Sequence, residues 1–192
     1  MTNLNPLQFL DRVSTPANML IEPAPNEEQL AQIFKAAMNA PDHKRLKPYR
    51  FITIKGEARQ ALSEVFINAV KIRKPDVDAA YLEKQGQKPL RSPLIVVLVA
   101  SLQDDPKVPE IEQMLCTGAV ANNMMLASNA LGFGSIWLTG DNTYDANVCR
   151  PLGLADSERI IGFIYMGTPK VKMPNREIFN LSDKVVDWIK PL

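Results

Sequence analysis

The chain has 192 residues, of which 46% are hydrophobic and 22% are charged, and its formal net charge is +1. This length and composition fit one globular domain with a sizeable core, and they exclude a disordered or fibrous chain. A charge so close to neutral also excludes a global field that draws the protein to nucleic acid or acidic lipid, so any basic site must be local.

Cysteine and histidine usage limits the metal and redox chemistry. Cys116 and Cys149 lack the spacing of metal ligands, and a single histidine cannot complete an ordinary zinc site. Two such cysteines, each best explained as a small buried residue, fit a reducing, cytoplasmic compartment. Residues 1–13 lack the pattern of a signal peptide, and asparagines interrupt the apolar stretch 114–132, so neither secretion nor a membrane span is expected.

Hydrophobic periodicity and capping residues predict alternating helices and strands. Asn26, with Gln29 three residues later, has the spacing of a capping box that opens a helix. The run 94–100 is apolar on both faces, which predicts a central strand. This interleaving argues for one layered α+β or α/β domain over residues 1–192. In chain order the expected elements are helices near 6–12 and 26–38, a strand at 51–54, a helix near 62–70, a polar helix and loop at 76–86, a strand at 94–100, a helix at 110–131, a strand at 134–138, a short helix at 144–149 and a strand at 160–166.

The longest predicted helix, 110–131, carries apolar residues around much of its circumference. A helix with this pattern must be covered on several sides, which in so small a chain indicates burial against a second subunit. Gly132 is expected to cap its C-terminus. The run Gly132-Phe133-Gly134 is not a dinucleotide fingerprint, because the third glycine is absent and a strand follows where a helix is required.

The segment 40–51 is the most informative stretch, because it combines the only histidine with four cations between a helix stop and a strand. Arg12-Val13-Ser14 upstream and Lys170-Val171-Lys172 downstream add hydroxyl, guanidinium and ammonium groups. Each segment alone is more often ordinary surface, and His43 alone is equally well a turn residue. Together they could converge on one phosphate. Since no Walker motif, nucleophile elbow or metal-binding constellation appears, a cofactor that carries the chemistry is the better model for an enzyme.

Taken together, these motifs resemble the FMN-dependent nitroreductase family, in its small, minimal branch. The resemblance extends from Arg12 to Pro169 and implies an α+β homodimer, with a central mixed β-sheet flanked by helices and one FMN per site in clefts between the subunits. It rests on segments in the family's order and spacing, namely Glu22-Pro23-Ala24-Pro25, Ala40-Pro41-Asp42-His43-Lys44, Lys107-Val108-Pro109, the run 132–137 and the run 161–169.

The resemblance also implies which residues bind FMN, whereas it assigns no side chain as a catalytic acid or base. Whether Lys170 or Arg45 also contacts FMN is left open. The implied positions are Arg12, Val13 and Ser14 at the phosphate and ribityl chain, Asn39 and His43 supplied from the partner subunit, Trp137, Leu138 and Thr139 beside the cofactor, and Lys172 at the phosphate.

Several positions depart from the family pattern. Asn18-Met19 stand where a second arginine is common, Asn39 replaces a basic residue, and Tyr49 replaces the usual tryptophan. Arg45 and Lys47 occupy positions that are often small or amide-bearing. These changes concern the phosphate arrangement and the substrate preference rather than the fold.

The activity implied by the resemblance is that of an oxidoreductase working in two half-reactions. NADH or NADPH gives a hydride to FMN, leaves, and is replaced by a nitroaromatic or quinone-like acceptor in a ping-pong sequence. Two alternatives remain open: a flavin-binding carrier or sensor with little turnover, and a flavin dehydrogenase acting on an unidentified metabolite. Neither a nucleic-acid nor a membrane partner is expected.

Overall fold

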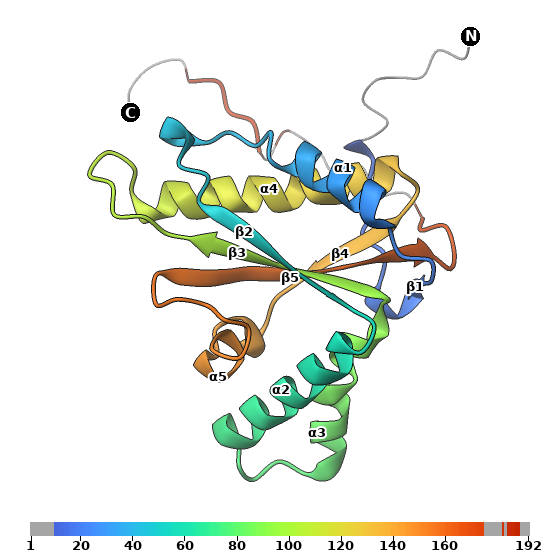
Figure 1. The fold of residues 1–192 in the computed structure, drawn as a ribbon. Helices are drawn as coiled ribbons and strands as arrows, with labels where there is room; N and C mark the ends of the chain where they lie inside the picture. Colours follow the sequence, from blue (N-terminus) through green and yellow to red (C-terminus); the bar gives the residue numbers. More distant parts are fainter. Residues whose placement is uncertain (1–9, 175–181, 183, 189–192) are drawn as a thin grey trace.

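The computed structural model describes residues 10–174, 182 and 184–188, and it places a five-stranded sheet between two layers of helices (Figure 1). The strands are β1 (Leu20–Ile21), β2 (Tyr49–Lys55), β3 (Leu94–Ser101), β4 (Gly134–Leu138) and β5 (Glu158–Pro169). The α-helices are α1 (Glu27–Ala37), α2 (Ala58–Arg73), α3 (Ala79–Gly86), α4 (Glu110–Ala130) and α5 (Ala146–Cys149). Short 3₁₀ turns connect them, namely η2 (Ala17–Met19), η3 (His43–Arg45), η4 (Lys88–Arg91) and η5 (Asp141–Thr143).

β5 organises the sheet because it pairs with three other strands. β3 lies along one of its edges, with β2 beyond it, and β4 lies along the opposite edge, while β1 pairs only with Thr168 and Pro169 at the C-terminal end of β5. Each pairing among the described strands is antiparallel, so within this part of the chain the sheet contains no parallel pair. The expected α+β fold, with a central sheet flanked by helices, is confirmed, whereas the described strand pairs are all antiparallel and not mixed as expected.

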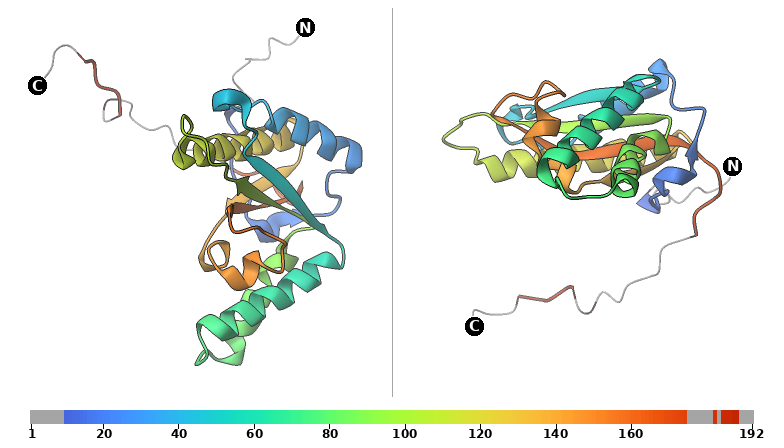
Figure 2. Two further views of the ribbon diagram at one scale, coloured as in Figure 1. Left: turned by 60° about the vertical axis from the view of Figure 1, so that its left-hand side comes forward. Right: turned by 90° about the horizontal axis from the view of Figure 1, so that it is seen from below.

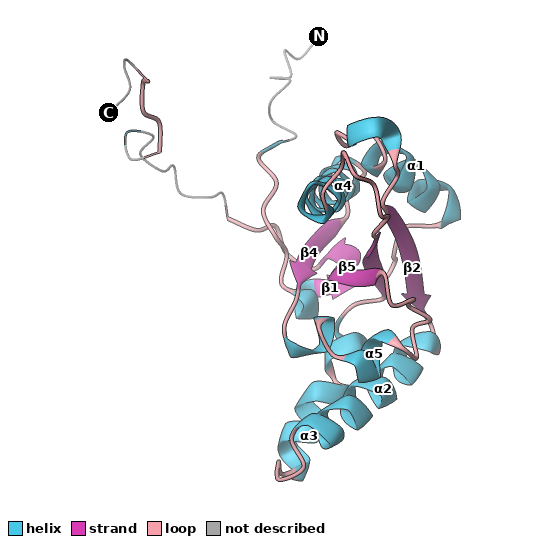
Figure 3. Ribbon diagram, turned by 90° about the vertical axis from the view of Figure 1, so that its left-hand side faces the viewer, coloured by secondary structure: helices cyan, strands magenta, loops and turns pink. Residues whose placement is uncertain are grey.

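Each face of the sheet has its own hydrophobic core. Figure 3 shows from the side the helices that cover the two faces. α1 and α4 cover one face, and α2, α3 and α5 lie on the other, an arrangement also visible in Figure 2. β3 serves both cores, because Ile95, Val97 and Val99 point to the α2 side while Leu94 and Val96 point to the α4 side. All five are at most 1% exposed, which confirms that the apolar run is a central strand.

Local capping signals are confirmed at both long helices of the α4 face. The Asn26 side chain accepts a hydrogen bond from the backbone of Gln29, and the Gln29 side chain accepts one in return, which completes the capping box of α1. Gly132 has φ +85° after α4, and Phe133 N–H donates to Ser128 O at 2.9 Å, as in a Schellman motif. The helix expected near residues 6–12 falls mostly outside the described residues.

α4 is only partly covered in the single chain. Its buried side packs on the sheet and on α1, whereas Ile111 and Leu115 are 60% and 66% exposed and Met114 is 38% exposed. These three side chains form an apolar stripe at the N-terminal half of the helix, and such stripes mark interaction surfaces. No helix in the described part of the chain is long and apolar enough to cross a membrane.

Candidate functional site

β4 contains Trp137 and Leu138, two of the predicted site residues, and Thr139, another of them, follows the strand directly. The Trp137 ring lies over Gly162 of β5, and its Nε1 donates to Ile161 O at 3.2 Å. Leu138 points to the opposite face and packs against the α2 core, while Thr139 is exposed. β5 pairs with one edge of β4 only, and no described strand pairs with the other edge. A ligand on that edge would therefore meet backbone N–H and C=O groups.

The Arg12-Val13-Ser14 segment lies beside the start of β4. Arg12 Nη1 donates to Ser14 Oγ at 3.3 Å, and the following residue, Thr15, donates from its backbone N–H to Ser135 O at 3.1 Å. Gly134 is required for this approach, because a Cβ there would lie 2.7 Å from Thr15 Oγ1. The chain therefore brings its N-terminal segment to β4 through close backbone packing.

A cavity of about 200 Å³ joins this segment to the C-terminal side of the fold. Val13 lines it together with Lys172, which follows β5, and with Gly132 at the end of α4. Lys170 N–H donates to Met19 O at 2.8 Å and so holds the strand end in place. The N-terminal segment and the segment after β5 thus line one cavity, to which Val13 and Lys172 contribute together with the acidic Asp11, whereas Arg12 and Ser14 are not among its lining residues.

A second cavity, of about 100 Å³, lies at the other end of β4. Leu138 and Thr139 line it, together with the cations Lys88 and Arg91 of η4. Both cations are half-buried, and neither forms an ion pair with a carboxylate of the described residues. Burial lowers the pKa of Lys88, and the neighbouring Arg91 guanidinium adds to this effect. The Asp141 carboxylate also lines this cavity and opposes the lowering of the Lys88 pKa, without forming a direct ion pair with either cation. Half-buried cations that lack a direct ion pair are costly and can mark a site for an anionic or hydrogen-bond-accepting ligand.

The sequence analysis missed Lys88 and Arg91. The sequence did contain one signal for them, because both cations lie directly before the predicted central strand, and the ends of buried strands are common places for ligand sites. Lys88 and Arg91 are far from Thr139 in the sequence. They line the same cavity only because η4 and the end of β4 meet on the α2 side of the sheet.

Unsatisfied polar atoms also gather around this segment. Among the described residues, the buried side-chain polar atoms without a hydrogen-bond partner belong to Arg73, Ser135, Asn142 and Thr143. Ser135 precedes the Trp137–Thr139 segment on β4, while Asn142 and Thr143 follow it in η5, and Asn142 Oδ1 accepts from Arg73 Nη2 at 3.1 Å. Such atoms are uncommon in native structures and call for an explanation beyond packing.

His43 lies elsewhere, near the N-terminus of α4, and Asn39 lies just after α1. His43 Nδ1 is 2.7 Å from Glu112 Oε2, and Asn39 Nδ2 donates to Lys35 O at 3.3 Å. The cavity that Lys172 lines touches α4 at Asn129 instead. Seventeen residues of helix separate Glu112 from Asn129, or about 25 Å at 1.5 Å per residue. One chain alone therefore does not bring His43 to the cavity that Val13 and Lys172 line.

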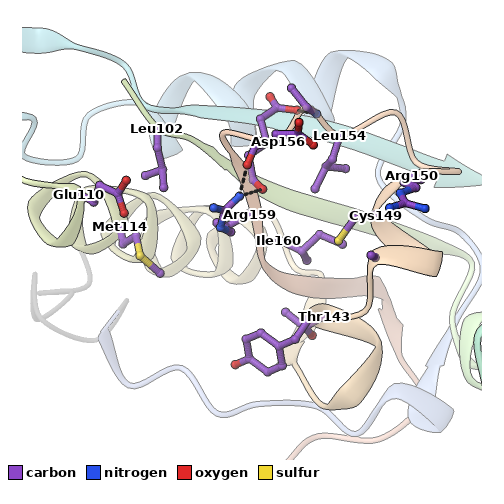
Figure 4. A pocket seen from close by; sticks show the side chains of 14 residues that line it. Leu102, Glu110, Met114, Thr143, Cys149, Arg150, Leu154, Asp156, Arg159 and Ile160 are labelled. Atoms are coloured by element: carbon purple, nitrogen blue, oxygen red, sulfur yellow. Dashed lines mark hydrogen bonds between the residues drawn. The ribbon is translucent and has the colours of Figure 1, made fainter. Parts of the chain in front are cut away.

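A third cavity, of about 440 Å³, contains none of the predicted site residues (Figure 4). Its walls include Met114 of α4 and Ile160 of β5, and the Arg159 guanidinium is held by backbone carbonyl groups of Asp156 and Glu158. Cys149 also lines it, but burial raises the pKa of its thiol, so the thiol is not activated as a nucleophile.

Fold and site together define an α+β domain with a strand edge that has cations near both of its ends. The chain belongs to the nitroreductase family, a family of oxidoreductase enzymes, whose model matches residues 20–168. It is 39% identical over 156 residues to YdjA of Escherichia coli (strain K12), provisionally named an NAD(P)H nitroreductase, with 81% of this chain and 84% of YdjA covered. A similarly named protein of Haemophilus influenzae is 36% identical over 152 residues, covering 78% of this chain and 80% of that protein.

A solved structure agrees with this assignment at the level of the fold. A nitroreductase-like protein from Bacillus cereus superposes with a TM-score of 0.83 at 20% identity, covering 99% of this chain and 100% of that one.

Proposed function

We propose that this protein is a cytoplasmic, FMN-dependent oxidoreductase that uses NADH or NADPH to reduce nitroaromatic or quinone-like acceptors. The observation that carries the proposal is the edge of β4 that no described strand covers beyond the Thr15–Ser135 contact, with cations near both of its ends, Lys172 near the start of β4 and Lys88 with Arg91 beyond its end. Five residues of strand span about 17 Å. That length suits a ligand with an anionic phosphate at one end and, at the other, a ring whose rim carries hydrogen-bond acceptors.

The residues present fit FMN in this orientation. Arg12 and Lys172 would hold the phosphate through charge-assisted hydrogen bonds, with Ser14 beside the ribityl chain and Val13 at the cavity wall. Backbone groups of the segment Trp137–Thr139 would hydrogen-bond the ring.

The cations at the far end of β4 add an electrostatic role. Lys88 and Arg91 would favour negative charge at the neighbouring edge of the ring.

Bound FMN supplies the redox chemistry, taking a hydride from the nicotinamide donor and giving it to the acceptor that replaces the donor in a ping-pong sequence. The chain contributes orientation, phosphate neutralisation and hydrogen bonding. No side chain serves as an obligatory acid or base in this proposal, since backbone N–H groups and water can supply protons. The raised pKa of the Cys149 thiol is consistent with a structural role for that residue.

The functional unit proposed is a homodimer with FMN sites at the subunit interface. The exposed stripe of Ile111, Met114 and Leu115 gives α4 a surface for a partner. If α4 packs against its symmetry mate across a twofold axis, the N-terminal end of one helix meets the C-terminal end of the other. Asn39 and His43 of one subunit would then reach the β4 edge of its partner.

The decisive test is the visible spectrum of the purified protein, followed by anaerobic addition of NADH or NADPH. A bound flavin that bleaches with either donor and regains its colour with 1,4-benzoquinone is the expected result. Flavin that does not bleach would favour a carrier or sensor instead. A protein with no affinity for FMN would overturn the proposal.

A further inference from the structure

The loop that links α1 to β2 contains an unusual backbone. Lys44, Arg45 and Lys47 have φ values of 60°, 58° and 51°, in the left-handed region that residues other than glycine rarely adopt. Residues 42–47, here the basic loop, therefore hold three cationic side chains on a costly backbone. Such conformations persist only where surrounding contacts impose them, and they gather at ligand-binding segments.

Those contacts are present in the structure. The Asp42 carboxylate accepts hydrogen bonds from Leu46 N–H at 3.1 Å and from Lys47 N–H at 2.8 Å, which closes the loop on itself. Gln103 Nε2 donates to Leu46 O at 2.7 Å, and the backbone N–H of Gln103 donates to Gln113 Oε1 at 2.9 Å. Gln113 is only 1% exposed on α4. The basic loop is thus anchored to the buried side of a long helix and is pre-organised.

Two of its three cations have no counter-ion. Lys44 is paired with Asp105, and the Asp42 oxygens are occupied by backbone amides. Arg45 and Lys47 are exposed, and no carboxylate among the described residues forms an ion pair with either. The loop therefore presents two uncompensated positive charges at fixed backbone positions, next to the apolar stripe of α4.

We infer that Arg45 and Lys47 recognise the phosphate groups of the nicotinamide donor and make NADPH the preferred donor over NADH. This inference rests on the proposed function, in which His43, within the same loop, reaches the flavin of the partner subunit. FMN already has Arg12 and Lys172 for its own phosphate. NADPH differs from NADH by a single additional phosphate, and cations held in place before binding favour the more highly charged donor.

The test compares kcat/KM for NADPH and NADH in the FMN-loaded dimer, with 1,4-benzoquinone as the fixed acceptor. Arg45→Asn and Lys47→Asn remove each charge with a side chain that tolerates the left-handed backbone. We expect the native protein to prefer NADPH. Each substitution should lower the ratio of kcat/KM for NADPH to kcat/KM for NADH by about tenfold, which is the effect of losing one charge-assisted phosphate contact. The value of kcat/KM for NADH itself should change much less.

Two controls separate a phosphate contact from a general effect. Lys71→Gln removes a surface charge from α2, on the opposite side of the sheet, and should leave the ratio unchanged. Arg45→Lys should retain most of the preference, because it keeps the charge. Equal use of both donors by the native protein would overturn the inference. So would an unchanged ratio of the two kcat/KM values in the double variant that combines Arg45→Asn with Lys47→Asn. A bound flavin that neither donor reduces would overturn the proposed function and this inference with it.

Discussion

The phosphate end of the proposed site depends on individual side chains. Arg12→Ala should weaken FMN binding by about tenfold to a hundredfold, because a hydrogen bond to a charged group contributes roughly 1.5–3 kcal/mol. Lys172 lines the adjoining cavity and should soften this loss, so that Arg12→Ala with Lys172→Ala binds FMN more weakly than either single variant. Dissociation constants from flavin fluorescence measure both effects. Unchanged FMN affinity in Arg12→Ala would show that Arg12 does not bind the phosphate. Lys35→Ala on α1 is the control, because it also removes one positive charge.

His43 tests whether the loop near the start of α4 belongs to the flavin site. His43→Ala should lower FMN occupancy or turnover while the circular dichroism spectrum stays the same, since the side chain is half-exposed and its polar contact is with a surface carboxylate, that of Glu112. Glu112→Gln is the matched variant, because it weakens that contact and keeps the imidazole. If His43→Ala shifts the melting temperature and leaves FMN affinity intact, the residue is a structural turn residue.

At the scale of elements, one ion pair ties three strands together. Arg50 of β2 donates from Nε and Nη2 to the two carboxylate oxygens of Glu158 on β5, each at 2.6 Å, and Ser101 of β3 donates to the same carboxylate at 2.8 Å. The hydrogen bond from Arg50 lowers the pKa of Glu158 from 4.5 to about 2.

This shift predicts a pH-dependent contribution to stability. Because the folded-state pKa is depressed, the contribution is fully present above the unfolded-state value and is lost as the pH falls from about 4.5 to about 2. Glu158→Gln should therefore unfold at lower urea concentration than the native protein at pH 7, and the difference should shrink towards pH 2.5. A difference that is independent of pH would show that the pair contributes through packing alone.

The contact between β4 and β5 offers a second test at this scale. An alanine Cβ at position 162 would lie 2.0 Å from Trp137 Nε1, so Gly162→Ala must displace the indole ring. Overpacking of this kind costs about 1–3 kcal/mol. Gly118→Ala in α4 is a matched control, because its Cβ would lie 3.9 Å from the same ring and alanine favours a helix. Urea denaturation should show destabilisation at position 162 and none at 118.

Elements with local signals could be predicted from the sequence, whereas the site could be predicted only in part. The capping box at Asn26 and the apolar run of β3 depend on neighbours in the chain, and both are confirmed. The meeting of Lys172 with Val13 was anticipated from resemblance. Lys88 and Arg91 were missed, because their place beside Thr139 results from tertiary packing across the α2 face. The left-handed backbone of the basic loop was equally hidden, since lysine and arginine have no preference for it.

At the scale of the whole molecule, we expect folding, flavin binding and dimerisation to be linked. Val185, Val186 and Trp188 are 63%, 88% and 81% exposed in the single chain, and Figure 2 shows residues 184–188 apart from the sheet and helices. Burying such side chains against a partner contributes about 1.5–3 kcal/mol each. Truncation before Val185 should therefore shift the protein towards monomer and release FMN.

Size-exclusion chromatography with simultaneous flavin absorbance checks this expectation. Trp188→Ala in the full chain should give an intermediate shift, since it removes one large side chain and keeps the rest of the segment. A truncated protein that elutes as a stable monomer and still holds FMN would contradict the shared-site arrangement.

The length of α4 has a consequence for mixtures of variants. Arg12 and His43 lie near opposite ends of this helix, so a twofold dimer with shared sites takes one residue from each chain at every flavin. A heterodimer of Arg12→Ala and His43→Ala subunits would then concentrate both defects in one site and leave the other intact. Random reassortment of two impaired homodimers should restore about one quarter of the native sites, because about half of the dimers are mixed. Such complementation between two damaged chains would occur only if neither subunit completes a site by itself.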